Sequence, residues 1–107
     1  MADDLPPGVT VETVYAVEIS YSPEAAVRRP PVRLEHLTRI AELLDAGRII
    51  EAGGFLDFSA AMLLVRANSE AEAIALVRDD VYVRSGVWID DARARAYGRV
   101  VTDANRR

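Results

Sequence analysis

The sequence predicts a single α+β domain in which a four-stranded antiparallel sheet carries two helices on one face. The chain of 107 residues is long enough for one domain and too short for two. Half of its residues are apolar and 28% are charged, which is typical of a globular protein rather than a disordered one. Stretches of strand-like alternation and of helical spacing follow one another along the chain, and their order predicts the fold.

The first strand is predicted to begin near Thr13 and to end at Ser22-Pro23. Residues 1–12 before it are rich in Asp, Pro and Gly, and we expect them to form a flexible leader. Successive side chains of a strand point to opposite faces. The face that carries the large apolar side chains consists of Tyr15, Val17, Ile19 and Tyr21.

A helix is predicted from Val32 to Ala46, after a loop that ends in Pro30-Pro31. Proline is tolerated in the first helical turn because its missing N–H would have no partner there. Gly47 follows at the position of a left-handed C-terminal cap, and Arg39 lies on the polar side of the helix. The apolar stripe predicted to face the core consists of Leu34, Leu37, Ile40, Ala41 and Leu44.

Two further strands are predicted on either side of a short turn at residues 56–59. The first runs from Arg48 to Phe55, with Gly53-Gly54 as a bend or bulge. The second runs from Ala60 to Ala67 and is almost continuously apolar. That pattern predicts a strand that is buried on both faces.

A second helix and a closing strand complete the predicted domain. Ser69 and Glu72 form a capping box, from which a short helix runs to about Arg78. A polar connection is predicted over residues 79–86, and a last strand or strand pair over residues 87–101.

The predicted order of elements is β-α-β-β-α-β, which is the ferredoxin-like arrangement. It occupies residues 13–101, and residues 102–107 are expected to form a flexible tail. Two helices cover only one face of such a sheet, whereas the apolar pattern of the strand at residues 60–67 predicts burial on both faces. A second copy of the sheet would cover the other face, so we expect a homodimer in the form of a dimeric α+β barrel.

The composition excludes several kinds of site and partner. The formal net charge of −4 argues against a nucleic-acid partner, whose sequence-independent binding depends on neutralising phosphates. The chain has no Cys and no Lys, which excludes thiolate and lysine chemistry. No apolar stretch approaches the ~20 residues that span a bilayer. With no secretory signal visible, we expect a cytoplasmic protein without a membrane partner.

The single His of the chain, His36, and the nearby Arg33 are the first candidates for chemistry. On a helical wheel His36 lies at the edge of the apolar stripe and Arg33 inside it, so both are expected to face the sheet. Two interpretations stay open. Either His36 makes a structural hydrogen bond and Arg33 a surface ion pair, or both line a pocket at the start of the helix that favours an anion. Since no carboxylate lies three or four residues from His36, we expect no metal and no cofactor.

Further candidates follow the second helix. Asp79 and Asp80 are, on their own pattern, solvated loop residues. Tyr82 and Trp88 are amphipathic aromatics that either line a pocket or pack in the core or an interface. No serine has the sequence context of a nucleophile elbow, so a Ser-His-Asp triad is not visible as a motif.

The combination of these segments resembles the YCII-like family, over about residues 14–101. The chain departs from the family pattern at Val81, where the family usually has Pro, and at Gly54, where Pro often follows Gly. Both departures loosen the backbone near the expected pocket. The segments that carry the resemblance, in order, are Arg33-Leu-Glu-His36-Leu, Asp45-Ala-Gly47-Arg-Ile-Ile-Glu-Ala-Gly53-Gly54, Ser69-Glu-Ala-Glu-Ala and Asp80-Val-Tyr82-Val-Arg-Ser-Gly86-Val.

The resemblance implies a dimeric α+β barrel with a pocket that holds a His–Asp pair, and it selects Asp80 over Asp79 as the partner of His36. Members of the family are proposed to be small-molecule enzymes, and a related one removes chloride from a chlorinated hydroxyquinol. We therefore expect a lyase- or isomerase-type enzyme in which His36 moves a proton and Asp80 fixes its tautomer.

The expected ligand is a small molecule with an anionic or phenolic group, which Arg33 would bind. The other residues expected to bind the substrate are Tyr82, Tyr21 and Trp88. The alternative function is a non-catalytic domain that binds a small ligand or serves as a dimerisation module. An enclosed pocket around His36 and Asp80 would disfavour the purely structural role.

Overall fold

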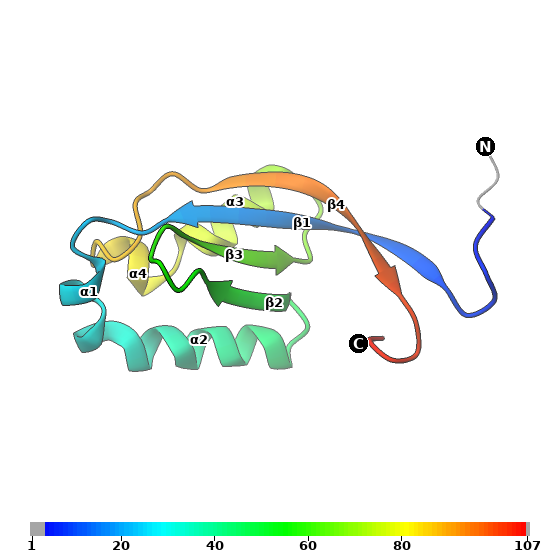
Figure 1. Ribbon diagram of the computed structural model, residues 1–107, viewed down its shortest axis with the longest axis horizontal. Coiled ribbons are helices and arrows are strands. Elements are labelled where there is room, and N and C mark those ends of the chain that lie inside the picture. Colours follow the sequence, from blue (N-terminus) through cyan, green and yellow to red (C-terminus); the bar gives the residue numbers. More distant parts are fainter. Residues whose placement is uncertain (1–3, 107) are drawn as a thin grey trace.

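The computed structural model describes residues 4–106 of the chain. Four strands form one antiparallel sheet in the order β2-β3-β1-β4 (Figure 1). The strands are β1 (Thr10–Ser20), β2 (Ile49–Gly54), β3 (Ala60–Val65) and β4 (Arg93–Val101). The helices are α1 (Ala25–Arg28), α2 (Arg33–Asp45), α3 (Glu70–Arg78) and α4 (Val81–Arg84), with a 3-10 turn, η1 (Pro30–Val32), before α2. The predicted α+β, ferredoxin-like arrangement is confirmed.

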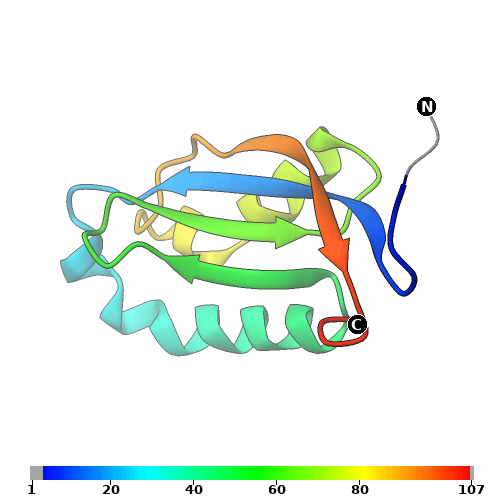
Figure 2. The same ribbon diagram turned by 45° about the vertical axis from the view of Figure 1, so that its right-hand side comes forward.

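The two long helices cover one face of the sheet. Helix α2 packs along β2, and α3 packs against β1 and β4; the views in Figures 1 and 2 agree on this layering. The core between the layers includes Val17 from β1, Leu63 from β3, Ile40 from α2 and Val77 from α3. None of the described helices is long and apolar enough to cross a membrane.

The opposite face of the sheet carries no helix in the described part of the chain. In β3, Leu63 and Val65 point into the core, whereas Met62 on the other face is 42% exposed. Tyr97 of β4 is also exposed. In the single chain β3 is therefore fully buried on one face only, and the homodimer that would cover the other stays a prediction.

Helix α2 lies within one residue of its predicted ends, but the predicted core face was wrong except at Ile40. His36 and Ile40 are its buried residues, and Leu43 packs against the core. Leu34 is 82% exposed. Three other members of the predicted stripe are exposed as well: Leu37, Ala41 and Leu44.

A polar contact explains why α2 turns a different face to the sheet. The observed face brings His36 and Arg39 to the buried carboxylate of Asp80, which accepts a hydrogen bond from each. An orientation that buried the leucine stripe would leave Asp80 inside the core without these donors, and an unpaired buried charge is costly.

The predicted polar connection over residues 79–86 was wrong in part, because it contains the four-residue helix α4. Val81 and Tyr82 at the start of this helix are buried. A helix of one turn has no detectable periodicity, which is why the sequence pattern did not reveal it. The region predicted as a last strand or strand pair contains β4 and, before it, a single bridge between Tyr21 and Trp88.

Helix α3 begins as its capping box predicts, with a small shift in one partner. The hydroxyl of Ser69 accepts a hydrogen bond from the backbone N–H of Glu72 at 3.1 Å. The carboxylate of Glu72 accepts in return from the backbone N–H of Asn68, at 3.1 Å, instead of from Ser69. The first contact satisfies a donor that the first helical turn leaves unpaired, and the second ties the residue before the cap to that turn.

Strand β1 begins at Thr10, earlier than the predicted start at Thr13. Glu12 within this extension accepts hydrogen bonds from Arg66 and from Arg99. The flexible leader and the flexible tail stay predictions, and residues 1–3 and 107 lie outside the described residues.

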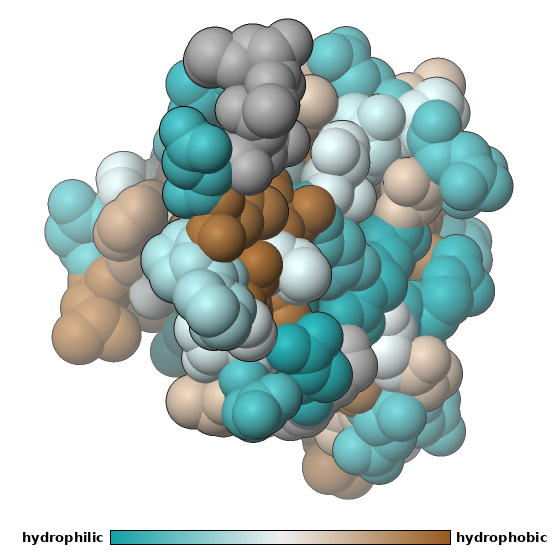
Figure 3. All heavy atoms as spheres, turned by 90° about the vertical axis from the view of Figure 1, so that its right-hand side faces the viewer, coloured by the Kyte–Doolittle hydropathy of each residue, from teal (hydrophilic) through white to brown (hydrophobic). Residues whose placement is uncertain are grey.

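Figure 3 looks onto the end of the molecule where β1 begins and β4 ends. Apolar side chains gather in the middle of this view, with hydrophilic ones around them. Val11 and Val100, which pair across the two strands, are both exposed at this end. The cavity described next lies at the opposite end of the sheet, where β1 ends and α2 begins (Figure 1).

Candidate functional site

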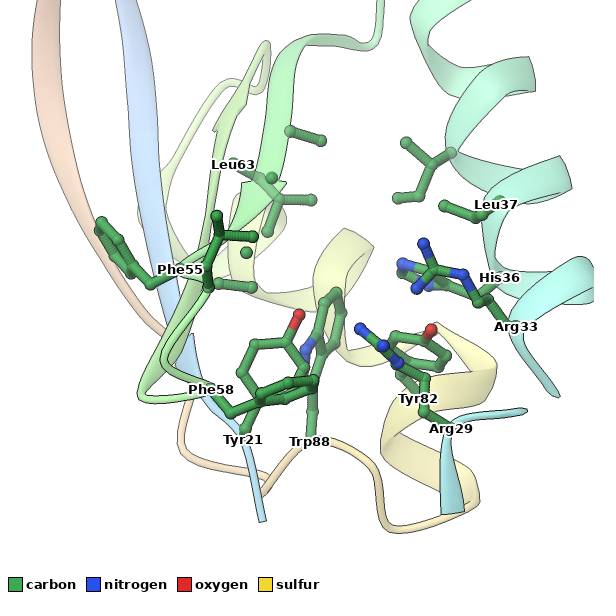
Figure 4. A pocket seen from close by; sticks show the side chains of 16 residues that line it. Tyr21, Arg29, Arg33, His36, Leu37, Phe55, Phe58, Leu63, Tyr82 and Trp88 are labelled. Carbon is green, nitrogen blue, oxygen red and sulfur yellow. The ribbon is translucent and has the colours of Figure 1, made fainter. Parts of the chain in front are cut away.

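A cavity of about 400 Å³ lies between the start of α2 and the inner face of the sheet (Figure 4). Residues from four parts of the chain line it: the α1–α2 region, the β2–β3 hairpin, the end of β1 and the segment from α4 to Trp88. The predicted site residues that line it are His36, Arg33, Tyr21, Tyr82 and Trp88. Asp80, the remaining one, lies behind His36 and does not line the cavity.

His36 and Asp80 form the predicted hydrogen bond. Nδ1 of His36 lies 2.7 Å from Oδ2 of Asp80, and both residues are buried. Asp79, the neighbouring carboxylate, is exposed to solvent. Helix α2 brings His36 to this position because the ring lies on its buried face, one turn before Ile40.

Two further donors hold the carboxylate of Asp80 in place. The backbone N–H of Tyr82 donates to Oδ2 at 2.9 Å, so Asp80 caps the short helix α4. Nη1 of Arg39 donates to Oδ1 at 3.1 Å. With His36, Asp80 therefore has three protein donors and is fixed from three sides.

These contacts determine the charge of Asp80 and the tautomer of His36. Burial alone would raise the pKa of Asp80, but the hydrogen bonds from His36, Tyr82 and Arg39 outweigh it and hold that pKa below its ordinary value. An ionised carboxylate only accepts hydrogen bonds, so Nδ1 of His36 must carry the proton. The other ring nitrogen, Nε2, has no hydrogen-bond partner among residues 4–106, and the ring borders the cavity.

Aromatic side chains fix the plane of the His36 ring. The ring of Tyr82 stacks on it, with centroids 3.6 Å apart and an angle of 9° between the planes. Trp88 meets both rings edge-on, at 5.1 Å from His36 and 5.2 Å from Tyr82. Within the described residues, the Tyr82 hydroxyl and the Trp88 Nε1 are buried without a hydrogen-bond partner.

Two arginines reach the cavity from the segment before and at the start of α2. Arg29 and Arg33 both point into it in Figure 4. The guanidinium of Arg29 lies over the ring of Phe58, 4.7 Å from its centroid. Burial raises the pKa of Tyr82, although the charges of Arg33 and Arg29 oppose that shift. Tyr82 is therefore a neutral phenol that can donate a hydrogen bond.

Sequence reasoning missed Arg29 and Arg39. Arg39 was assigned to the solvent side because the predicted apolar stripe lies on a different side of α2 from the face that is buried. Arg29 carried a usable signal: it stands directly before Pro30-Pro31, and the 3-10 turn that these prolines begin leads straight into α2 and Arg33.

Tyr21 reaches the cavity because Gly54 makes room for it. A Cβ atom at Gly54 would overlap the hydroxyl of Tyr21. Any larger residue there would push the Tyr21 ring away from β2. The departure from the family pattern at Gly54 therefore has a structural reason in this chain.

Among the described residues, no three His, Cys, Asp or Glu side chains are grouped so that they could hold a metal ion. The prediction of a site without metal or cofactor stays a prediction. The arrangement does combine a carboxylate-oriented imidazole, two guanidiniums and a phenol around one cavity.

The sequence model of the YCII-related domain matches residues 13–92. A search of the curated proteins finds no match.

Proposed function

The chain belongs to the YCII-related family, and we propose that it is a small-molecule enzyme in which His36 and Asp80 carry out acid–base chemistry of the lyase or isomerase type. One observation carries the proposal. The buried hydrogen bond between His36 Nδ1 and Asp80 leaves Nε2 unpartnered beside a cavity that can hold a small molecule.

In the proposed reaction Nε2 of His36 removes a proton from an acidic C–H next to a substrate carbonyl. The electron pair moves to the carbonyl oxygen and gives an enolate. Return of the proton from Nε2 to another carbon completes an isomerisation, while loss of a leaving group completes an elimination. General-base catalysis of this kind typically contributes about 10²–10⁴ in rate.

Asp80 acts through His36 and is a positioning residue. Its negative charge stabilises the imidazolium that forms when Nε2 takes a proton. The donors Arg39 and Tyr82 N–H hold the carboxylate in its ionised form, so the proton stays on the imidazole. A second candidate function, ligand binding without turnover, is favoured only by the unpaired Tyr82 hydroxyl, which a ligand oxygen would satisfy.

Exchange of substrate hydrogen with D2O tests the proposal. A panel of small carbonyl compounds with acidic C–H groups is incubated with the protein in D2O, and deuterium uptake is followed by NMR. The wild-type chain should exchange at least one compound, His36→Ala should exchange none, and Asp80→Asn should be slower by roughly a hundredfold or more. Glu42→Gln, on the exposed side of α2, serves as the matched control and should exchange at the wild-type rate.

Compounds that bind in the cavity without exchange or turnover would favour the binding domain over the enzyme. Exchange that survives in His36→Ala would remove His36 from the mechanism.

A further inference from the structure

The lining of the cavity is positively charged. It includes Arg29 and Arg33 and, in this described part of the chain, no Asp or Glu. Asp80 lies behind His36, and its charge is engaged by His36 and Arg39. In a chain with a formal net charge of −4, two guanidiniums at one cavity create a local preference for an anion.

Both guanidinium charges act on the hydroxyl of Tyr82. Tyr82 is 2% exposed, and its hydroxyl has no hydrogen-bond partner among the described residues. An unpaired buried donor is costly, so a ligand oxygen at this point would be stabilised by the hydroxyl as well as by the two cations.

We propose that Arg29, Arg33 and the Tyr82 hydroxyl form a carboxylate subsite, and that the substrate is a small, flat, unsaturated carboxylate. This inference rests on the proposed function, because it assigns the substrate class of the same cavity. A guanidinium presents its donors in a planar fork that matches the two oxygens of a carboxylate.

The remainder of the cavity matches a flat apolar body. Tyr21 and Phe58 present aromatic rings, and Leu37, Ile40 and Leu63 present aliphatic side chains. Aromatic and aliphatic walls favour an unsaturated or cyclic molecule, and a volume of about 400 Å³ limits it to a small one. The His36 ring borders the same space, so a bound substrate can offer its C–H to Nε2.

Phe58 fixes one of the two guanidiniums. Its ring meets Tyr21 edge-on at 5.3 Å and lies under Arg29. Phe58 adopts a φ of 61°, in the left-handed region that non-glycine residues rarely adopt. A residue held there by its surroundings is typical of ligand sites, and here the conformation carries the ring that supports Arg29.

The test is binding of matched carboxylates and amides to the full chain, measured by calorimetry and ligand-observed NMR. The probes are benzoate, cinnamate and 2-furoate, their uncharged amides, and phenylphosphonate. The carboxylates should bind more tightly than the amides and than the phosphonate. Arg29→Gln and Arg33→Gln should each weaken carboxylate binding by about ten- to a hundredfold.

Two further variants complete the test. Tyr82→Phe removes only the unpaired hydroxyl, so it should weaken carboxylate binding without loss of thermal stability. Arg28→Gln, next in sequence to Arg29 but outside the cavity lining, should bind like the wild type. Amides that bind as tightly as carboxylates, phenylphosphonate that binds more tightly, or arginine variants with unchanged affinity would each overturn the subsite.

The two proposals fail in different ways. Selective carboxylate binding without deuterium exchange leaves the subsite in place and removes the acid–base function. Exchange of neutral carbonyl compounds that is unaffected by Arg29→Gln and Arg33→Gln leaves the acid–base function in place and removes the carboxylate subsite.

Discussion

At the scale of single residues, Asp80 contributes both to the stability of the domain and to the proposed chemistry. It is fully buried, caps α4 and accepts hydrogen bonds from His36 and Arg39. One carboxylate therefore holds helix α4, orients the imidazole and ties α2 to the segment after α3.

The first prediction concerns stability against pH. The pKa of Asp80 in the folded chain lies below its ordinary value of 3.8. Its contribution should therefore be complete above that value and be lost as the pH falls through the folded pKa. In urea unfolding, Asp80→Asn should be less stable than wild type by about 1–3 kcal/mol at pH 7, and the difference should shrink below pH 3.8.

Asp79→Asn is the matched control, because this neighbouring side chain is 80% exposed. It should change the free energy of unfolding by no more than about 0.5 kcal/mol. A difference between Asp80→Asn and wild type that is independent of pH would contradict the assigned ionisation of Asp80.

Residue identities predicted part of the site and missed part of it. The single His and the resemblance to the family selected His36 and Asp80, and the structure places them 2.7 Å apart. Asp80 alone could not be distinguished from Asp79 by pattern, since its burial depends on a four-residue helix that has no periodicity. Arg39 was missed because its reach to Asp80 depends on which face α2 buries.

At the scale of elements, caps and turns predicted the ends of helices better than hydrophobicity predicted their faces. Helix α2 is flanked by Pro30-Pro31 and Gly47, and its ends were confirmed within one residue. Its leucines suggested a core face, yet Leu34 and Leu37 are exposed. A hydrophobic stripe in the sequence shows which residues lie on one side of a helix. It does not show that a buried carboxylate such as Asp80 needs hydrogen-bond donors from another side of that helix.

The second prediction concerns the β2–β3 hairpin. Phe58→Gly removes a side chain from a left-handed position, where a non-glycine residue costs about 1–2 kcal/mol, and also removes the ring beside Tyr21 and Arg29. These effects oppose each other, so the melting temperature should stay within a few degrees of the wild-type value or rise. Binding of a flat carboxylate should weaken, because Arg29 loses the ring that supports it.

Val27→Ala is the control, since Val27 on α1 is 79% exposed and does not line the cavity. It should alter neither the melting temperature nor the binding. A severe loss of stability in Phe58→Gly would mean that the ring serves the fold and not the site.

At the scale of the whole molecule, one face of the sheet is covered and the other is open. Met62 and Tyr97 are exposed on the open face, beside Glu18, Arg93 and Arg95. The fold itself was predictable from the order of local signals, because the β-α-β-β-α-β order leaves few alternatives. The predicted homodimer stays a prediction, since it depends on a surface that a single chain leaves free.

The third prediction is a homodimer joined through this open face. Light scattering at micromolar concentration should give about twice the chain mass of 11.7 kDa. Met62→Glu places a charge in the expected interface and should shift the measured mass toward that of one chain. Leu34→Glu, at a more exposed apolar position on α2, should leave the mass unchanged. A monomer for the wild-type chain would contradict the barrel.

The position of Trp88 has a practical consequence for the binding and unfolding measurements. The chain has one tryptophan, and its indole lies edge-on to His36, Tyr82 and Tyr21 at the cavity. The native protein therefore carries an intrinsic fluorophore at its candidate site. Ligand titration, protonation of the imidazole and unfolding should each change the emission of this one ring, so binding constants can be measured on unlabelled protein.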